Sequence, residues 1–175
     1  PYDRFVTGLR KQHFEVYDEK VKQDIAFFGE EDAPISIGII FDRSGSMREK
    51  INRSRIALRR FIDASHPDDE FFVICFNHET DLIQEFTPSA EQIMSKLTLV
   101  EASGRTALYD AAYLGLEKIR QGKHARKALL IISDGQDNSS RYSYGQVRNL
   151  VKESEVQIYG IGVFGMHERG TSNES

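Results

Sequence analysis

Three short segments of this sequence carry hydroxyl and carboxylate side chains in positions suited to holding a metal ion. They are Asp42-Arg43-Ser44-Gly45-Ser46, Gly104-Arg105-Thr106 and Ser133-Asp134-Gly135. The donors that we predict are two carboxylates and three hydroxyl groups, from Asp42, Ser44, Ser46, Thr106 and Asp134. All are hard oxygen ligands, which suit a near-octahedral Mg²⁺ better than a metal that prefers thiolate or imidazole. We therefore predict a site for Mg²⁺, with Mn²⁺ or Ca²⁺ as alternatives.

The charge of this donor set also indicates what the ion would do. Two carboxylates neutralise a divalent cation but do not surround it with excess negative charge. Because the other donors are neutral hydroxyls, the ion stays electrophilic, and an open position accepts a carboxylate from outside. We expect the partner to be a protein ligand that presents an exposed Asp or Glu.

Each of these segments also has a simpler interpretation. Ser and Asp are common in turns and at helix N-termini, so Ser46 could merely cap a helix that begins at Met47. Asp110 lies one helical turn after Thr106, where it either orients the site or is an acid favoured by the positive end of a helix. Residues 137 and 138 either shape the rim of the site or make a turn.

The elements that must position these segments alternate between apolar, β-branched runs and amphipathic stretches, which is typical of helices on both faces of a mostly parallel sheet. The predicted strands are Ile35–Asp42, Glu70–Asn77, Asp81–Thr87, Lys127–Ser133 and Val156–Val163, and the predicted helices are Met47–Ala64, Ser89–Leu97, Thr106–Gln121 and Tyr144–Glu153. The link from Asn77 to Asp81 is too short for a crossover helix, so those two strands must pair antiparallel. The predicted fold class is α/β, a doubly wound sheet with one antiparallel edge strand.

The order of the strands decides whether the polar segments meet. In a doubly wound sheet, ligands bind beyond the carboxyl ends of the strands, where the strand order reverses. Asp42 and Asp134 each follow an apolar strand. If the strand order is of the doubly wound kind, these two strands are neighbours at the reversal point, and their carboxylates then converge.

The two ends of the chain differ from this body. Phe14–Tyr17 and Lys22–Phe28 flank the polar turn Asp18-Glu19-Lys20, which predicts a β-hairpin. The last residues are polar and aperiodic, so we expect a frayed tail. The predicted organisation is an N-terminal β-hairpin extension over residues 1–33, one domain over 34–166 and the tail over 167–175.

Composition excludes several partner classes. The 175 residues carry a formal net charge of −4, which gives no support to nucleic-acid binding. The longest apolar runs are far shorter than the roughly 20 residues that cross a bilayer, so we expect no membrane insertion by this segment. The single cysteine, Cys75, lies in an apolar stretch and is expected to be a buried, inert thiol.

An enzymatic alternative is a Mg²⁺-assisted phosphoester hydrolase, because such an ion beside a doubly wound sheet also suits phosphoryl transfer. The sequence lacks a P-loop, an Asp nucleophile in a D-x-D setting and a second carboxylate cluster. The glycines at 160, 162 and 165 match a dinucleotide fingerprint, but the acidic residue about 20 positions further on is missing. We therefore predict a binding module that is not an enzyme.

The metal-site segments, with Thr106-Ala107-Leu108-Tyr109-Asp110, make the chain resemble a von Willebrand factor type A domain with a metal-ion-dependent adhesion site. The likeness covers about Ile35 to Gly165. It implies an adhesion or scaffolding role, and it implies a metal held by Asp42, Ser44, Ser46, Thr106 and Asp134, some of them through water.

The leading segments Val6–Leu9 and Phe14–Asp18 further resemble a bacterial branch of this family, often secreted or in the cell envelope, with a strand-rich extension. This implies an extracellular or cell-envelope location. The family's usual last helix and edge strand are not expected after Phe164, which puts an affinity switch through that helix in question.

Overall fold

The computed structural model describes residues 10–26, 33–135 and 137–164. The chain divides into two compact units, residues 1–33 and 34–175. In the first unit, a 3₁₀ helix η1 (Lys11–His13) precedes the antiparallel strands β1 (Val16–Asp18) and β2 (Val21–Gln23). Glu19 and Lys20 between them have positive φ angles of 46° and 69°, as a type I′ hairpin turn requires. The predicted hairpin is confirmed with shorter strands; the expected end at Phe28 lies outside the described residues.

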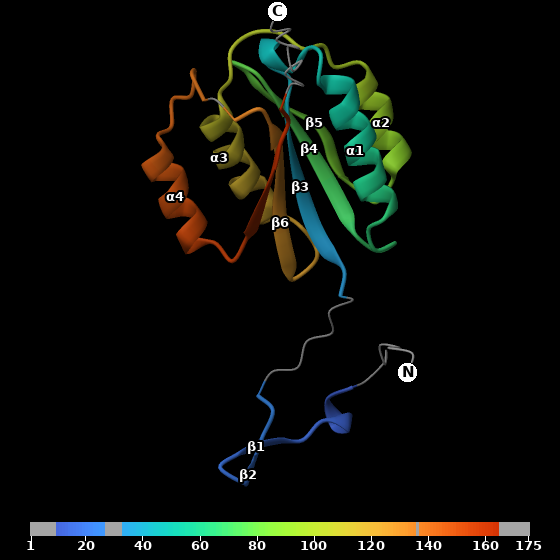
Figure 1. Cartoon of the computed structure of the whole chain (residues 1–175), viewed down its shortest axis with the longest axis vertical. Helices are drawn as coiled ribbons and strands as arrows, with labels where there is room; N and C mark the ends of the chain where they lie inside the picture. The colour runs from blue at the N-terminus through green and yellow to red at the C-terminus, as the bar shows by residue number, and fades with distance from the viewer. Residues whose placement is uncertain (1–9, 27–32, 136, 165–175) are drawn as a thin grey trace, which may run out of the picture. The chain divides into compact units, whose positions relative to one another are not determined.

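The second unit is built on a five-stranded sheet with the order β5-β4-β3-β6-β7 (Figure 1). The strands are β3 (Ile35–Asp42), β4 (Glu70–Phe76), β5 (Thr80–Thr87), β6 (Arg126–Ser133) and β7 (Gln157–Gly162). All neighbouring pairs are parallel except β4 with β5. The mostly parallel sheet with an antiparallel edge is as predicted. Strands β3 and β6 are neighbours where the strand order reverses, which confirms the adjacency expected from the sequence.

Helices cover both faces of the sheet. Figure 1 shows α1 (Ile51–Asp63) and α2 (Ala90–Thr98) on one side, with α3 (Leu108–Ile119) and α4 (Tyr144–Glu153) on the other. Successive residues of a strand point to opposite faces, so a strand covered on both faces is apolar throughout. In β3, accordingly, Ile37, Ile39 and Phe41 join the core cluster that contains residues of α1 and α2, while Ile40 joins the cluster that contains residues of α3.

Two helices begin later than the sequence predicts. The helix expected from Met47 is a 3₁₀ turn, η2 (Gly45–Met47), followed by α1 from Ile51, and the helix expected from Thr106 begins at Leu108. The backbone groups at both starts bond to other loops instead: Gly45 N–H donates to the Gly104 carbonyl at 3.0 Å, and Thr106 N–H donates to Asn138 Oδ1 at 2.9 Å. The polar residues that precede each helix therefore lie in loops.

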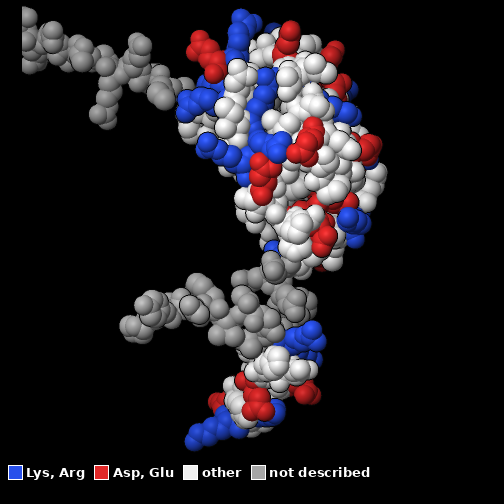
Figure 2. Space-filling model, turned by 90° about the vertical axis from the view of Figure 1, so that its right-hand side faces the viewer, with Lys and Arg blue, Asp and Glu red and all other residues white. Residues whose placement is uncertain are grey.

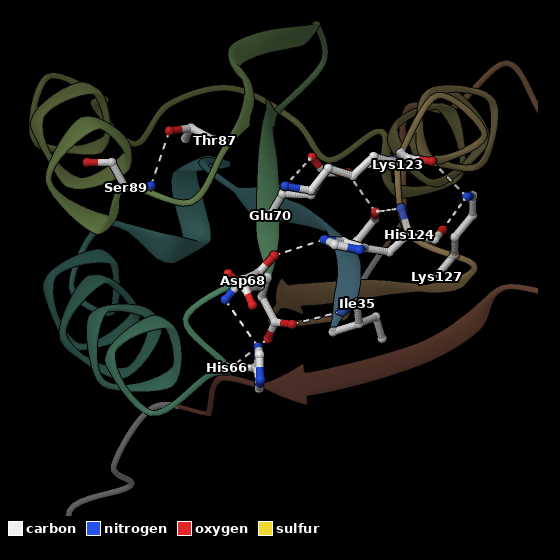
Figure 3. A network of polar contacts seen from close by, with 12 residues as sticks. Ile35, His66, Asp68, Glu70, Thr87, Ser89, Lys123, His124 and Lys127 are labelled. Carbon is white, nitrogen blue, oxygen red and sulfur yellow. Dashed lines mark hydrogen bonds and ion pairs between the residues drawn. The ribbon is translucent and has the colours of Figure 1, made fainter. Parts of the chain in front are cut away.

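A buried polar network ties together the amino ends of the strands (Figure 3). Glu70 Oε1 accepts hydrogen bonds from Ser36 Oγ and from Lys123 N–H, both at 2.7 Å. Asp69 Oδ1 accepts one from Ile35 N–H at 2.8 Å. Because these residues start β3 and β4 and precede β6, the network fixes the end of the sheet opposite to Asp42 and Asp134.

The α1 and α2 side, which Figure 2 faces, carries basic and acidic side chains mixed together. Arg59 of α1, for example, pairs with Asp63 at 2.8 Å and with Glu91 at 3.0 Å. Acidic side chains therefore lie beside basic ones on this face. Among the described residues, no helix combines the length and the apolar character that a membrane crossing requires.

Candidate metal centre

The loops that follow β3 and β6 hold the predicted donors at one edge of the sheet. Asp42 ends β3, and Asp134 directly follows β6. A pocket of about 360 Å³ at this edge is lined by Ser46, Thr106 and Asp134, together with Lys50, Asn138, Val163 and Phe164. Asp42 and Ser44 are buried and do not line the pocket.

The buried pair is linked to the pocket by short polar contacts. Ser44 N–H donates to Asp42 Oδ1 at 2.7 Å, and the hydroxyl oxygens of Ser44 and Ser46 lie 3.1 Å apart. Ser133 Oγ donates to Asp42 Oδ2 at 2.5 Å. Both Asp42 oxygens therefore accept a bond, and the carboxylate is fixed in its orientation. Ser46 caps neither η2 nor α1, so the helix-cap interpretation of this residue is wrong.

Thr106 is placed by two neighbouring loops. Its N–H donates to Asn138 Oδ1, and its carbonyl accepts from Asn138 N–H, each at 2.9 Å. Gly104, two residues earlier, has a φ of +80°, and a Cβ there would lie 2.4 Å from His78 Nδ1. Only glycine suits this backbone position. Asn77, which follows β4, also braces the loop, because its Nδ2 donates to the Ser103 carbonyl at 2.9 Å.

Asp110 stabilises a loop and does not line the pocket. Its Oδ1 accepts hydrogen bonds from the N–H groups of Arg141 and Tyr142, at 2.8 and 2.9 Å. Asp110 therefore fixes the segment that begins near Asn138 against the first turn of α3. Its effect on the pocket is indirect, through this loop.

A positive charge already lies in the pocket. Lys50 Nζ donates to Asp134 Oδ2 at 3.0 Å, and the two side chains are only 19% and 12% exposed. The pocket thus accommodates a cation beside one of the two predicted carboxylates. Among the described residues, no cluster of three or more His, Cys, Asp or Glu side chains is arranged to hold a metal. A divalent ion here would need the hydroxyl donors as well, which is the composition of the predicted set.

Three residues of this site were not predicted from the sequence: Lys50, Ser133 and Asn77. Ser133 could have been placed from the register of the two strands. Phe41 pairs with Ile132, so the next residues, Asp42 and Ser133, lie side by side. Lys50 had only its spacing, one helical turn after Ser46, and charged residues at helix starts are common on solvated faces.

The family model for the von Willebrand factor type A domain matches residues 37–136 of this chain. The chain belongs to that family. Among curated proteins, this von Willebrand factor type A domain is similar to an uncharacterized protein of Synechocystis, with 26% identity over 142 residues. The match covers 77% of this chain and 33% of the relative, so the chain spans about a third of that protein.

Solved structures agree with the fold of this von Willebrand factor type A domain. Manganese-loaded Plasmodium vivax TRAP protein is 21% identical with a TM-score of 0.65, covering 75% of this chain and 58% of that one. The N-terminal domains of the type V pili tip protein Mfa5 from Porphyromonas gingivalis are 16% identical with a TM-score of 0.55. That match covers 60% of this chain and 20% of Mfa5. At such identities these structures support the fold alone.

Proposed function

We propose that this domain is a divalent-metal-dependent protein-binding module. In the proposal, Mg²⁺, Mn²⁺ or Ca²⁺ is held by Asp42, Ser44, Ser46, Thr106 and Asp134. The observation that carries it is that three of these residues line one pocket at the reversal point of the sheet, while the hydroxyl oxygen of Ser44 lies 3.1 Å from that of Ser46. Von Willebrand factor type A domains are adhesion and protein-interaction modules and commonly bind divalent ions, which supports the proposal.

The arrangement suits an ion that faces outward. Asp42 and Ser44 lie behind the pocket, whereas Ser46 is exposed and Asn138 lies on its rim. When bound, the ion would supply an electrophilic position for a carboxylate of the ligand. The residues of the chain would bind the ion, and the exposed loop residues around it would select which ligand fits.

A phosphoester hydrolase has less support. Among the described residues that line the pocket, Asp134 is the only one with a carboxylate, and the described part of the chain offers no second acidic cluster for another ion. Two-metal phosphoryl chemistry needs such a cluster. We expect phosphatase and nucleotidase assays with Mg²⁺ or Mn²⁺ to give no turnover above the protein-free rate.

The proposed partner is a protein with an exposed Asp or Glu, in an extracellular or bacterial cell-envelope setting. One protein with a similar fold is a pilus tip protein, and the proposal extends such a setting to this chain. The formal net charge of −4 gives no reason to expect nucleic acid as a ligand.

The proposal is tested by calorimetric titration with Mn²⁺ and Mg²⁺, followed by capture of ligands with Mg²⁺ or with EDTA. We expect the captured partner to lose binding on chelation and on replacement of one of its carboxylates, Asp→Asn or Glu→Gln. If chelation and every carboxylate variant leave partner affinity intact, the bridging role is wrong even where the ion binds.

A further inference from the structure

Backbone hydrogen bonds fix the position of Lys50 beside the pocket. Lys50 immediately precedes α1, its N–H donates to the Met47 carbonyl at 2.8 Å, and its carbonyl accepts from Ser54 N–H at 3.0 Å. The start of α1 thus keeps the ammonium group within reach of Asp134. The same pocket is lined by Ser46 and Thr106, so the ammonium shares its space with three of the five proposed metal ligands.

We propose that Lys50 is a built-in competitor of the metal ion. This inference rests on the proposed function, because it concerns the same pocket. The ammonium group and the ion both use the carboxylate of Asp134, so metal binding requires the Lys50 side chain to release Asp134 and turn away. The measured metal affinity then reflects the free energy of binding to the five ligands minus the free energy of the Lys50–Asp134 ion pair that the metal must break.

The electrostatic reason is repulsion between like charges. An ammonium group left about 4 Å from a divalent ion in a partly buried pocket would be strongly disfavoured. Lys50 can avoid this because its four-carbon stem is flexible and about a fifth of the side chain is already exposed. Without the ion, the ammonium neutralises Asp134, so this partly buried carboxylate is not left without a counter-charge. Asp134 is therefore already paired when no metal is bound.

If Lys50 assisted metal binding instead of competing with it, its removal would change the metal affinity in the opposite direction. If the ion pair served to orient Asp134 for the metal, removal of the ammonium would weaken metal binding. If Lys50 competes, removal of the ammonium strengthens it. A substitution that keeps the length of the side chain but not its charge separates the two.

The experiment is a calorimetric titration of the whole chain with Mn²⁺, for the wild type, Lys50→Met, Lys50→Arg and Lys118→Met. Lys118 is the matched control, since it pairs with Glu85 at 2.7 Å, is 14% exposed and does not line the pocket. We expect Lys50→Met to bind Mn²⁺ about fivefold more tightly or better, the equivalent of losing one ion pair of ordinary strength. Lys50→Arg and Lys118→Met should stay within about twofold of the wild type.

The outcomes separate this inference from the proposed function. Equal or weaker Mn²⁺ binding by Lys50→Met, with normal binding by the wild type, overturns the competitor role and leaves the metal site intact. Absence of Mn²⁺ binding in every variant contradicts both. A second measurement needs no substitution: in wild-type protein with ¹³C-methylated lysines, Mg²⁺ should shift the Lys50 signal and leave the Lys118 signal in place. An unmoved Lys50 signal at saturating Mg²⁺ would also overturn the competitor role.

Discussion

At the scale of single residues, Asp42 is the side chain whose chemistry is hardest to replace. It is fully buried, and both of its oxygens accept hydrogen bonds from Ser44 and Ser133. We expect Asp42→Asn to abolish Mn²⁺ binding in calorimetry, because it removes one of only two carboxylates. Its amide group would also face a donor, so we expect a loss of about 1–3 kcal/mol in the free energy of unfolding.

Asp63→Asn is the control for Asp42→Asn. Asp63 lies at the end of α1 in an exposed pair with Arg59, so its loss should leave both Mn²⁺ binding and stability nearly unchanged. Unchanged Mn²⁺ binding in Asp42→Asn would mean that the ion is held elsewhere.

Cys75 provides a residue-scale prediction about reactivity. It is fully buried in β4, and this burial raises the pKa of its thiol to about 12. A raised pKa keeps the thiol protonated at pH 8, and the thiolate is the reactive form. Iodoacetamide should therefore not modify the folded protein at pH 8, whereas it should react fully in guanidinium chloride. Mass spectrometry measures both, and rapid labelling of the folded protein would show that β4 opens easily.

The predicted donors could be identified from residue type and from their place after apolar strands, because parallel strands end at one edge of a sheet. Lys50 could not be identified in this way. A lysine at a helix start has the same sequence pattern whether it faces solvent or a carboxylate in a loop 84 residues away. Its contact with Asp134 depends on the turn η2, which the periodic pattern of the helix did not reveal.

At the scale of the elements, the fold class and the positions of most strands and helices follow from the alternation of apolar and amphipathic stretches, while the starts of α1 and α3 do not. The apolar spacing of each helix continues backwards into the preceding loop, so periodicity alone extends the helix. Backbone hydrogen bonds from Gly45 and Thr106 to other loops keep these residues outside the helices, so each helix begins later than predicted. These partners are distant in sequence, and no local rule contains them.

The loop before α3 gives a prediction at this scale. Gly104→Ala puts a side chain at a φ of +80° and against His78, so we expect a loss of at least about 1 kcal/mol in the free energy of unfolding. Weaker Mn²⁺ binding should accompany it, because Thr106 follows in the same loop. Gly145→Ala in α4 is the control: its added Cβ meets nothing nearer than 3.9 Å and should stabilise the helix slightly. Denaturant melts and titrations of both variants would decide this, and equal behaviour would contradict it.

The network at the amino ends of the strands should affect stability without affecting the site. Both hydrogen bonds to Glu70 end on Oε1, so Glu70→Gln keeps an acceptor there but makes it neutral, and it places an amide NH2 at the buried Oε2 position, 3.9 Å from Lys123 Nζ. Because hydrogen bonds to a charged acceptor are stronger and a buried unpaired donor is costly, we expect a loss of about 1–3 kcal/mol. Its Mn²⁺ affinity should equal that of the wild type. The exposed Glu153→Gln serves as the control in denaturant titration. A large change of Mn²⁺ affinity in Glu70→Gln would show that the two ends of the sheet are coupled.

At the scale of the whole molecule, the core and the site are separate. The buried apolar residues lie between the sheet and its helices, and the proposed metal ligands lie beyond them at one edge. The metal-free protein should therefore be folded by circular dichroism. Metal at about 100 times its dissociation constant should add roughly 2.7 kcal/mol to the free energy of unfolding. A metal-free protein that is unfolded would instead indicate a structural ion.

The buried network of Figure 3 has a consequence for how this domain can diversify. It anchors the strands at the end away from the pocket, so an exposed loop residue near the pocket such as Arg105 is spared that task. Random libraries at Arg105 could therefore sample new ligand preferences while the scaffold tolerates nearly every change. The same separation would let related domains exchange ligands over evolutionary time without redesigning the sheet that supports them.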